Sequence, residues 1–455
     1  METTTNTATN AAEARAKAEQ ALLEIQPRRT DKQIWGIYIA LCLISVVELY
    51  SASSHEITAS NVFAPVLRHV MFLIGGLAIM LFLQKTHYSK FLKWSYLFAI
   101  LSAVAMLYTL KYGDYINGAR RSFSVGGFFA IQPAEMVKIS AVLVIAGILS
   151  RSQMRKSADV TTRGLIQVTL CVLMASGLLF TQGLTNTLLL MAISLSMMLI
   201  GGVSWKKMGI VLGVFIILAG FGFGVKSVIE GFSNPEVTQV QKELVVPGTN
   251  ITVGVDKVED GKKNSIGRWS TWENRVARHF KSDKYNDPIS DMNQQEQYSY
   301  IAQAHGGIFG VMPGNSRETA RLPLAFSDYI YAIVIEEMGL LGGMFVLVMY
   351  LWLLARAGRI ANRCQTAYPA LLVIGMAVFI AFQAMAHMAI VTGVFPVSGQ
   401  PLPLISKGGT SILITSMALG IMLSVSRFAA RKGKKSEIRD ELSALPDEVK
   451  AANPT

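Results

Sequence analysis

The sequence predicts an all-α integral membrane protein with about ten transmembrane helices. The chain has 455 residues, of which 51% are hydrophobic and only 16% are charged. Apolar runs of roughly 20 residues, the length that crosses a hydrocarbon core of about 30 Å, recur from Trp35 to Val425. The formal net charge of +12 does not indicate a nucleic-acid partner, because the Lys and Arg residues alternate with the apolar runs.

Each predicted element follows from one apolar run or from the polar stretch between two runs. The chain divides into a cytoplasmic N-terminal tail (1–32), helices 1–7 (33–229), one long extracytoplasmic loop (230–327), helices 8–10 (328–427) and a cytoplasmic C-terminal tail (428–455). The expected spans are about 33–50, 62–83, 91–110, 134–149, 165–180, 184–200, 208–225, 328–354, 367–391 and 408–425.

The orientation follows from the short loops. Arg151, Arg155 and Lys156 follow the fourth span, Lys206 and Lys207 precede the seventh, and further basic residues follow the eighth and the tenth. All these loops fall on the side of the two termini. The positive-inside rule therefore places both termini in the cytoplasm and the long loop outside.

Five polar residues lie around the start of the fourth span: Arg120, Arg121, Gln132, Glu135 and Lys138. Glu135 and Lys138 are three positions apart, so they share one helix face near its outer end. Arginine offers a planar fork of donors to phosphate oxygens, which suits Arg120 and Arg121 to a lipid-linked pyrophosphate. The alternative is an anchor for lipid headgroups, with Glu135 and Lys138 as a structural ion pair.

Three acids mark the start of the eighth span. Along a helix, Glu336 and Glu337 would be rotated by about 80° and 180° from Asp328 and lie roughly 12 to 13 Å deeper, so the three do not share a face. Asp328 stands at the membrane surface, where a carboxylate can move a proton, although it could equally cap the helix. We expect the deeper glutamates to be structural and to pair with residues such as Lys138 or Arg68.

The segment 395–411 contains three prolines and three glycines between apolar flanks. A continuous helix is excluded there, and we expect a re-entrant or surface-lying segment whose backbone is satisfied by protein or by a water-filled cavity. His387, in the preceding span, is expected to be a packed, hydrogen-bonded histidine. No residue spacing indicates a zinc site, and no glycine loop indicates nucleotide binding.

Three blocks of the sequence carry a family resemblance. They are NGARRSFSVGGFFAIQPAEMVK at 117–138, the stretch from GGIFG to SDYIYAIVIEEMG at 306–339, and PVSGQPLPLISKGGTS at 396–411. Together they resemble the SEDS family (shape, elongation, division and sporulation) of ten-span bacterial peptidoglycan glycosyltransferases, over most of the chain. Pro-Gly-Asn-Ser at 313–316 is more similar to the division-type than to the elongation-type pattern.

The resemblance implies that the chain polymerises lipid II, the undecaprenyl-pyrophosphoryl disaccharide-pentapeptide, at the outer membrane face. It implies that Asp328, in SDYIY, is the general base that deprotonates the acceptor sugar hydroxyl. We expect a water-accessible cleft that contains Asp328, Lys138 and Glu135 and has the two arginines at its rim. The expected lipid II and pyrophosphate site comprises Arg120, Arg121, Gln132, Glu135, Lys138, Ser406 and Lys407.

The resemblance also implies a cofactor, partners and a location. A divalent cation, Mg²⁺ or Mn²⁺, would be shared between Asp328 and the substrate phosphates, without a dedicated protein site. The expected partners are a class B penicillin-binding protein transpeptidase and other divisome proteins. The expected location is the bacterial cytoplasmic membrane, at the division septum.

Departures from the family pattern leave other functions open. Leu324 stands where the family has Glu, Phe123 where it often has Trp, and Gln182 where it has an acid. The alternatives are an elongation-type polymerase, a lipid II flippase whose polar path is lined by intramembrane charges such as Arg68 and Glu336, and a non-catalytic division scaffold.

Overall fold

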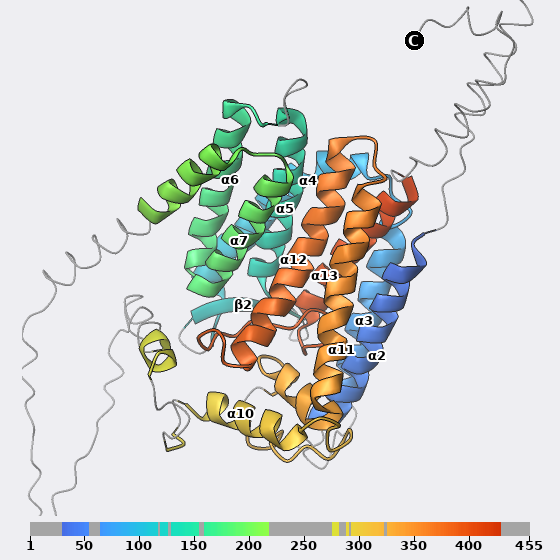
Figure 1. Cartoon of the computed structure of the whole chain (residues 1–455), viewed down its shortest axis with the longest axis vertical. Helices are drawn as coiled ribbons and strands as arrows, with labels where there is room; N and C mark the ends of the chain where they lie inside the picture. The colour runs from blue at the N-terminus through green and yellow to red at the C-terminus, as the bar shows by residue number, and fades with distance from the viewer. Residues whose placement is uncertain are drawn as a thin grey trace, which may run out of the picture. The chain divides into compact units, whose positions relative to one another are not determined.

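The computed structural model describes residues 30–53, 64–116, 119–125, 129–153, 159–217, 275–281, 288–290, 293–322 and 325–428. In this part of the chain, eight helices are long and apolar enough to cross a membrane (Figure 1). They are α2 (Lys32–Ser53), α3 (Ala64–Leu83), α4 (Ser89–Tyr112), α5 (Pro133–Ser152), α6 (Thr162–Phe180), α11 (Ile330–Ala361), α12 (Ala367–Val391) and α13 (Gly409–Phe428).

Two further helical segments match expected spans. α7 (Leu184–Ile200) is apolar but shorter than the eight. Residues 205–217 are helical where the seventh span is expected, and the remainder of that span, 218–225, lies outside the described residues. The chain is therefore a mostly helical, multi-pass membrane protein. The exact number of spans and the side of each terminus stay predictions.

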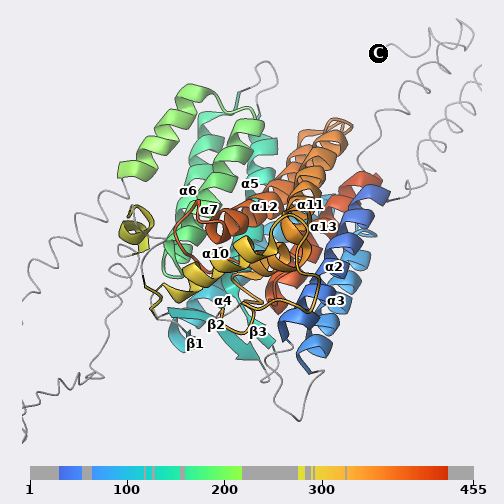
Figure 2. The same cartoon turned by 60° about the horizontal axis from the view of Figure 1, so that its bottom comes forward.

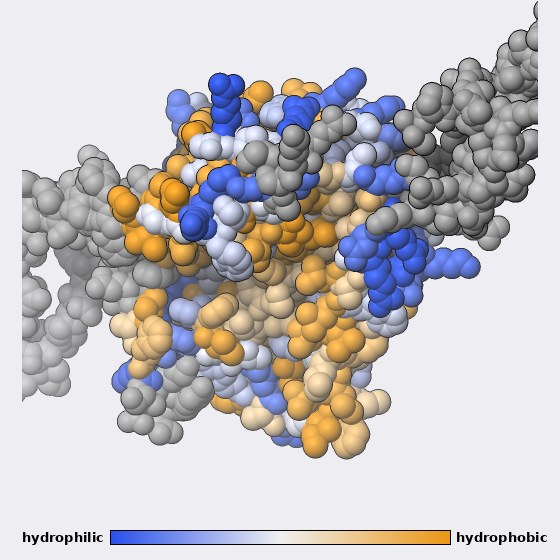
Figure 3. Space-filling model, turned by 45° about the horizontal axis from the view of Figure 1, so that its top comes forward, coloured by the Kyte–Doolittle hydropathy of each residue, from blue (hydrophilic) through white to orange (hydrophobic). Residues whose placement is uncertain are grey.

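Helix α5 forms the centre of the bundle. Nearly all of its residues are buried, and it packs against α4, α6, α7, α12 and α13. The outer helices expose apolar side chains instead, such as Leu97, Ile100 and Leu101 on α4. Figure 3 shows many such apolar side chains on the face turned to the viewer. This outward apolar surface fits a lipid environment.

A small sheet connects α4 to α5 and departs from the all-α prediction. Its antiparallel strands are β1 (Asp114–Ile116), β2 (Ala119–Val125) and β3 (Phe129–Ile131), in that order, and they lie together in Figure 2. The Thr410 hydroxyl donates to the Ala130 carbonyl at 2.8 Å and accepts from the Gln132 N–H at 3.2 Å. The sheet is thereby fastened to the start of α13.

The eighth span begins and ends later than predicted, and it is broken. Gly339, with φ of 72°, interrupts α11 between two helical halves. A continuous helix would join the N–H groups of Leu340 and Leu341 to the carbonyls of Glu336 and Glu337. The break frees all four of these groups.

The segment that follows α10 (Gln294–Gly306) satisfies the four groups freed by the break. The N–H groups of Val311 and Met312 donate to the carbonyls of Glu336 and Glu337 at 3.0 and 2.9 Å. In return, Leu340 and Leu341 donate to the carbonyls of Gly307 and Ile308 at 2.9 and 3.3 Å. A broken helix at membrane depth is tolerated only where protein completes its hydrogen bonds, and here it does.

Glycines make this close approach possible. A Cβ at Gly306 would collide with the Ile335 carbonyl, and a Cβ at Gly310 would collide with the Glu337 carbonyl. Gly310 also has a φ of 79°, in the left-handed region. The glycine-rich segment from Gly306 to Met312 is therefore part of the α11 structure rather than a free approach to it.

The expected long loop (230–327) contains several different parts. Its C-terminal portion folds as α10 and packs against α11. Residues 275–279, also within this loop, are helical. Residues 230–274 of the expected loop lie outside the described residues.

Candidate functional site

Asp328 does not cap α11. The N-cap is Tyr329, whose side chain makes no capping hydrogen bond, and the first helical residue is Ile330. The Asp328 carboxylate is half-buried. Asp328 therefore lies one residue before the N-cap and is not the capping residue expected in the alternative reading.

Gly399 shows what the Asp328 carboxylate faces. A Cβ built on Gly399 would lie 2.6 Å from Asp328 Oδ2 and 3.4 Å from Arg121 Nη1. The carboxylate and the guanidinium thus converge on one glycine, although they come from opposite halves of the sequence. Any larger residue at this position would push against the carboxylate. These three residues, Asp328, Arg121 and Gly399, are called the Asp328 cluster below.

The two arginines have different neighbours. Successive residues of a strand point to opposite faces, and Arg120 and Arg121 are successive in β2. Arg120 Nη1 donates to the carbonyls of Leu110 and Lys111 at the C-terminal end of α4. Only Arg121 reaches the Asp328 cluster, so the expectation that both arginines line its rim is wrong for Arg120.

Gln182 supports the backbone of β2 where the family pattern has an acid. Its Nε2 donates to the Arg120 carbonyl at 2.7 Å. An amide can donate this bond, whereas an ionised carboxylate cannot. Gln182 thus helps to position the strand that carries both arginines.

Glu135 and Lys138 form a buried ion pair. Lys138 Nζ donates to Glu135 Oε1 at 2.7 Å, and Lys138 and Glu135 are 0% and 3% exposed. Both lie in the first turns of α5 and share one face, as their spacing predicts. They are buried in this structure, so the expectation that they stand in a water-accessible cleft is wrong.

The segment 395–411 contacts the residues immediately before Asp328. The buried Ser406 hydroxyl donates to the Ser327 carbonyl at 2.7 Å, and the Lys407 N–H donates to the Phe326 carbonyl at 2.9 Å. Lys407 Nζ also lies 4.0 Å from the centre of the Phe326 ring. Ser406 and Lys407 therefore position the residues immediately before Asp328.

His387 contacts the same segment from α12. It is buried, and its Nδ1 lies 2.6 Å from the Gln400 carbonyl, next to Gly399. The expectation of a packed, hydrogen-bonded histidine is confirmed. The Gln132 side chain caps nothing at the start of α5, and only its N–H contacts Thr410.

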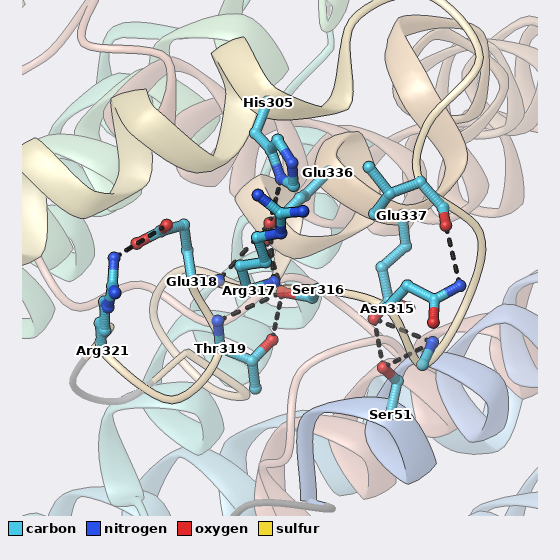
Figure 4. A network of polar contacts seen from close by, with 12 residues as sticks. Ser51, His305, Asn315, Ser316, Arg317, Glu318, Thr319, Arg321, Glu336 and Glu337 are labelled. Atoms are coloured by element: carbon cyan, nitrogen blue, oxygen red, sulfur yellow. Dashed lines mark hydrogen bonds and ion pairs between the residues drawn. The ribbon is translucent and has the colours of Figure 1, made fainter.

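Glu336 lies within a network of polar contacts, which Figure 4 shows. Its carboxylate contacts His305 Nδ1 at 2.9 Å and accepts from the Ser316 hydroxyl at 2.5 Å. It also accepts from the N–H groups of Arg317 and Glu318 at 3.0 and 3.4 Å. A buried carboxylate with four such contacts is well satisfied.

Glu337 faces α2. It accepts from the Ser51 hydroxyl and from the Gly314 N–H, the latter at 3.2 Å. The structural role predicted for the two glutamates fits these contacts, but the partners proposed for them are wrong. Lys138 pairs with Glu135, and Arg68 is exposed on α3.

Two features of the site region are missing from the sequence predictions. Gly399 belongs to a recognised block, but only the fold brings it to Asp328. Glu48 is fully buried in α2. An acid inside an apolar run is by itself a signal for a polar site in the membrane, and this signal is visible at Glu48.

The residues present do not form a dedicated metal site. No group of three or more His, Cys, Asp or Glu side chains in the described part of the chain could hold a metal ion. Asp328 contributes a single carboxylate and has the Arg121 guanidinium nearby.

Comparisons with known proteins identify relatives over most of the chain. The "probable peptidoglycan glycosyltransferase FtsW" of Bacillus subtilis (strain 168) is 27% identical over 411 residues, covering 88% of this chain and 91% of the relative. The "stage V sporulation protein E" of the same organism is 28% identical over 413 residues, covering 88% and 99%. The "probable peptidoglycan glycosyltransferase FtsW" of Aliivibrio salmonicida (strain LFI1238) is 26% identical over 426 residues, covering 90% and 93%.

Solved structures share the fold. A chain from the structure described as "Structural coordination of polymerization and crosslinking by a peptidoglycan synthase complex" has a TM-score of 0.60 and 22% identity, covering 88% of this chain and 98% of that one. The rod shape determining protein RodA of Thermus thermophilus has a TM-score of 0.55 and 22% identity, covering 88% and 97%.

The family model described as "Cell cycle protein" (FTSW_RODA_SPOVE) matches residues 31–239 and 268–431. These ranges contain every transmembrane helix of the described bundle and all three residues of the Asp328 cluster. The resemblance drawn from the three sequence blocks is confirmed, and the chain belongs to the FtsW/RodA/SpoVE family of cell cycle proteins.

Proposed function

We propose that this protein is a peptidoglycan glycosyltransferase that polymerises lipid II into glycan chains at the outer face of the cytoplasmic membrane. The family membership and the names of the relatives support the reaction class. The observation that carries the assignment of the site is the Asp328 cluster. It brings a half-buried carboxylate and a guanidinium to one point at the threshold of α11.

The proposed reaction needs a base and a group that stabilises a leaving phosphate. Asp328 takes the proton from the acceptor sugar hydroxyl while the hydroxyl oxygen attacks the anomeric carbon of the donor. A new glycosidic C–O bond forms, the bond from that carbon to the pyrophosphate breaks, and undecaprenyl pyrophosphate leaves. Arg121 stabilises the negative charge that develops on the pyrophosphate.

The other predicted site residues support this pair in the proposal. Ser406 and Lys407 hold the backbone of Phe326 and Ser327, so they orient Asp328. The buried ion pair of Glu135 and Lys138 stabilises the start of α5. Because both side chains are buried in this pair, we assign them no direct step.

A divalent cation remains part of the proposal only as a group bound with the substrate. When bound, Mg²⁺ or Mn²⁺ would neutralise charge on the pyrophosphate, using phosphate oxygens as its main ligands. The residues of this chain provide one carboxylate for it, Asp328. No step of the proposed reaction depends on the metal.

The partner and the location are proposed from the relatives. One structural neighbour belongs to a peptidoglycan synthase complex whose description is the coordination of polymerisation and crosslinking. We propose an equivalent complex here, with a class B penicillin-binding protein transpeptidase and other divisome proteins at the septum. The repeated FtsW name among the relatives favours division over elongation.

One experiment separates the three classes of function. The full-length protein, purified with its transpeptidase partner and placed in liposomes, is given fluorescent lipid II. The proposal predicts long glycan chains. Movement of lipid II between leaflets without polymer would support a flippase, and neither product, with the partner still bound, would support a scaffold. Either of the latter two results contradicts the proposal.

A further inference from the structure

The junction between α2 and α11 contains a carboxylate that no described residue satisfies. Glu48, on α2, is 0% exposed, and neither of its carboxylate oxygens has a hydrogen-bond partner in the described part of the chain. A bare carboxylate in such a place is strongly unfavourable, and the usual outcome is a proton or a cation on the group.

Glu337 lies across the junction from Glu48. Ser51, one turn after Glu48 on the same face of α2, donates to Glu337 Oε1, and the Gly314 N–H also donates to this oxygen. The second oxygen, Glu337 Oε2, is buried without a partner among the described residues. The two carboxyl groups interact electrostatically. Three unsatisfied acceptor oxygens therefore lie at one junction.

Glu336, the acid next to Glu337, has several hydrogen-bond contacts that Glu48 lacks among the described residues. Its two oxygens have four contacts, from His305, from Ser316 and from the backbone N–H groups of the next two residues (Figure 4). That set satisfies an ionised carboxylate. Glu48 has no such donors among the described residues, so an ionised Glu48 would add an unsatisfied negative charge beside two other acids.

The break in α11 also disfavours a further negative charge at this junction. The first half of α11 ends at Gly339, directly after the two glutamates. The C-terminal end of a helix carries partial negative charge, which disfavours further negative charge there and favours a positive one. A proton meets this requirement without needing a cavity, whereas no group of three or more metal-ligating side chains occurs in the described residues.

We propose that Glu48 is a proton-binding site that carries its proton at neutral pH and donates a hydrogen bond to Glu337 Oε2. The resulting carboxyl–carboxylate pair ties α2 to the first half of α11. The proton turns one Glu48 oxygen into a donor for Glu337 Oε2, so two of the three oxygens take part in a hydrogen bond, and it removes one of the two adjacent negative charges. This site is independent of the proposed glycosyl transfer.

Other titratable and charged groups surround the junction. On α3, His69 contacts the Ser45 hydroxyl at 2.6 Å, and Arg68 is exposed. On the segment before α11, His305 contacts Glu336, while Arg317 and Glu318 contribute their N–H groups to it. None of these side chains is a hydrogen-bond partner of Glu48. Because these groups could also titrate, a change of stability with pH supports the Glu48 proposal only if substitution of Glu48 removes that change.

Infrared spectroscopy of the full-length protein in nanodiscs tests the proton directly. A protonated carboxyl group has a C=O stretch that a carboxylate lacks. We expect this band in the native protein at neutral pH, its loss in Glu48→Gln, and its retention in the matched control Glu296→Gln on α10. Absence of any band that depends on Glu48 would overturn the proposal.

Thermal unfolding across pH provides a second test. An unfolded glutamate is ionised above about pH 5, so a folded state that keeps the proton loses stability relative to the unfolded state as pH rises, by up to about tenfold in the folding constant per pH unit. The native protein should show this slope between about pH 5.5 and 8, and Glu48→Gln should lack it. Equal slopes would contradict the proposal.

Two further outcomes are decisive. Stabilisation of the native protein by Na⁺, K⁺, Mg²⁺ or Ca²⁺ that disappears in Glu48→Gln would mean that Glu48 is ionised and binds a metal cation, which refutes the proton. If Glu48→Gln does not fold, Glu337→Gln replaces it. The C=O band should then persist but shift, because the acceptor of its hydrogen bond has changed, and an unshifted band would refute the pair.

Discussion

Asp328 and Glu336 both stand near the start of α11, but their carboxylates meet different surroundings. Glu336 is fully buried and surrounded by donors, most of them from the residues 316–318. Asp328 is half-buried, and it faces a missing side chain at Gly399 and a guanidinium at Arg121. A carboxylate held by several donors supports the structure, whereas a half-buried one beside a guanidinium at the start of a helix is placed to contact a substrate.

The same contrast separates the two segments that pack on α11. The segment from Gly306 to Met312 completes the backbone of the broken helix, and its hydrogen bonds replace the two that Gly339 removes. The segment 395–411 instead donates to the carbonyls of Phe326 and Ser327, just before Asp328, and its Pro403 carbonyl accepts from the Tyr350 hydroxyl of α11. One segment stabilises α11, and the other orients the residue that precedes it.

The largest expected effect is on the Asp328 side of this comparison. Asp328→Asn removes the proton acceptor, because an amide is not a base, while keeping the size of the side chain. We expect polymerisation to fall by about 10² to 10⁴-fold. The assay is lipid II polymerisation by the purified complex, with Asp159→Asn, in the loop between α5 and α6, as a matched control. An active Asp328→Asn variant would refute the base assignment.

The second effect compares the two successive arginines. Arg121→Gln should lower polymerisation by about 10² to 10³-fold, because it removes a charged donor beside the leaving group. Arg120→Gln should change it by only a few-fold, since this side chain donates to the end of α4. Rates measured side by side test the strand geometry. Equal losses would mean that both arginines bind the substrate.

The third effect concerns Gly399. In Gly399→Ala the new Cβ would lie 2.6 Å from Asp328 Oδ2, so the carboxylate must move. A displacement of about 1 Å in a catalytic group can cost on the order of 100-fold in rate. Gly314→Ala is not a suitable control, because Gly314 has a φ of 90°, but Gly36→Ala in α2 is open and helical. Full activity of Gly399→Ala would separate Gly399 from the site.

The smallest effect lies at the opposite end of α11. Cys364 follows the helix, and burial raises the pKa of its thiol to about 11. The thiolate is the reactive form, so alkylation at pH 8 should be slow and should accelerate about tenfold per pH unit toward pH 11. Mass spectrometry of the alkylated protein checks this. A Thr366→Cys variant in a Cys364→Ser background provides an exposed thiol for comparison.

Most of the helices could be predicted from the sequence because each apolar run folds locally. Asp328 could be singled out for the same reason, since it stands where a loop enters an apolar run. The break at Gly339 could not be predicted from the sequence, because it depends on hydrogen bonds to a segment roughly 30 residues away along the chain. Recognising β2 as a strand would have separated Arg120 from Arg121, since the period of two does so directly.

The convergence on Gly399 was also beyond the sequence. Asp328, Arg121 and Gly399 are contributed by three separate blocks, and only the fold brings them together. Glu48 was missed for the opposite reason. The apolar run that contains Glu48 predicts the helix correctly. The prediction of the helix does not depend on the single acid inside it, although burying that acid is energetically unfavourable.

The most direct test of this contrast measures the rate and the thermal midpoint together for two conservative variants. Asp328→Asn should lose polymerisation and keep the native thermal midpoint. Glu336→Gln should lower the midpoint, because its amide places a donor against existing donors at a stability cost of about 1 to 3 kcal/mol, and its folded fraction should keep most of the rate. The reverse pattern, with the rate lost at Glu336 and only stability lost at Asp328, would contradict the account.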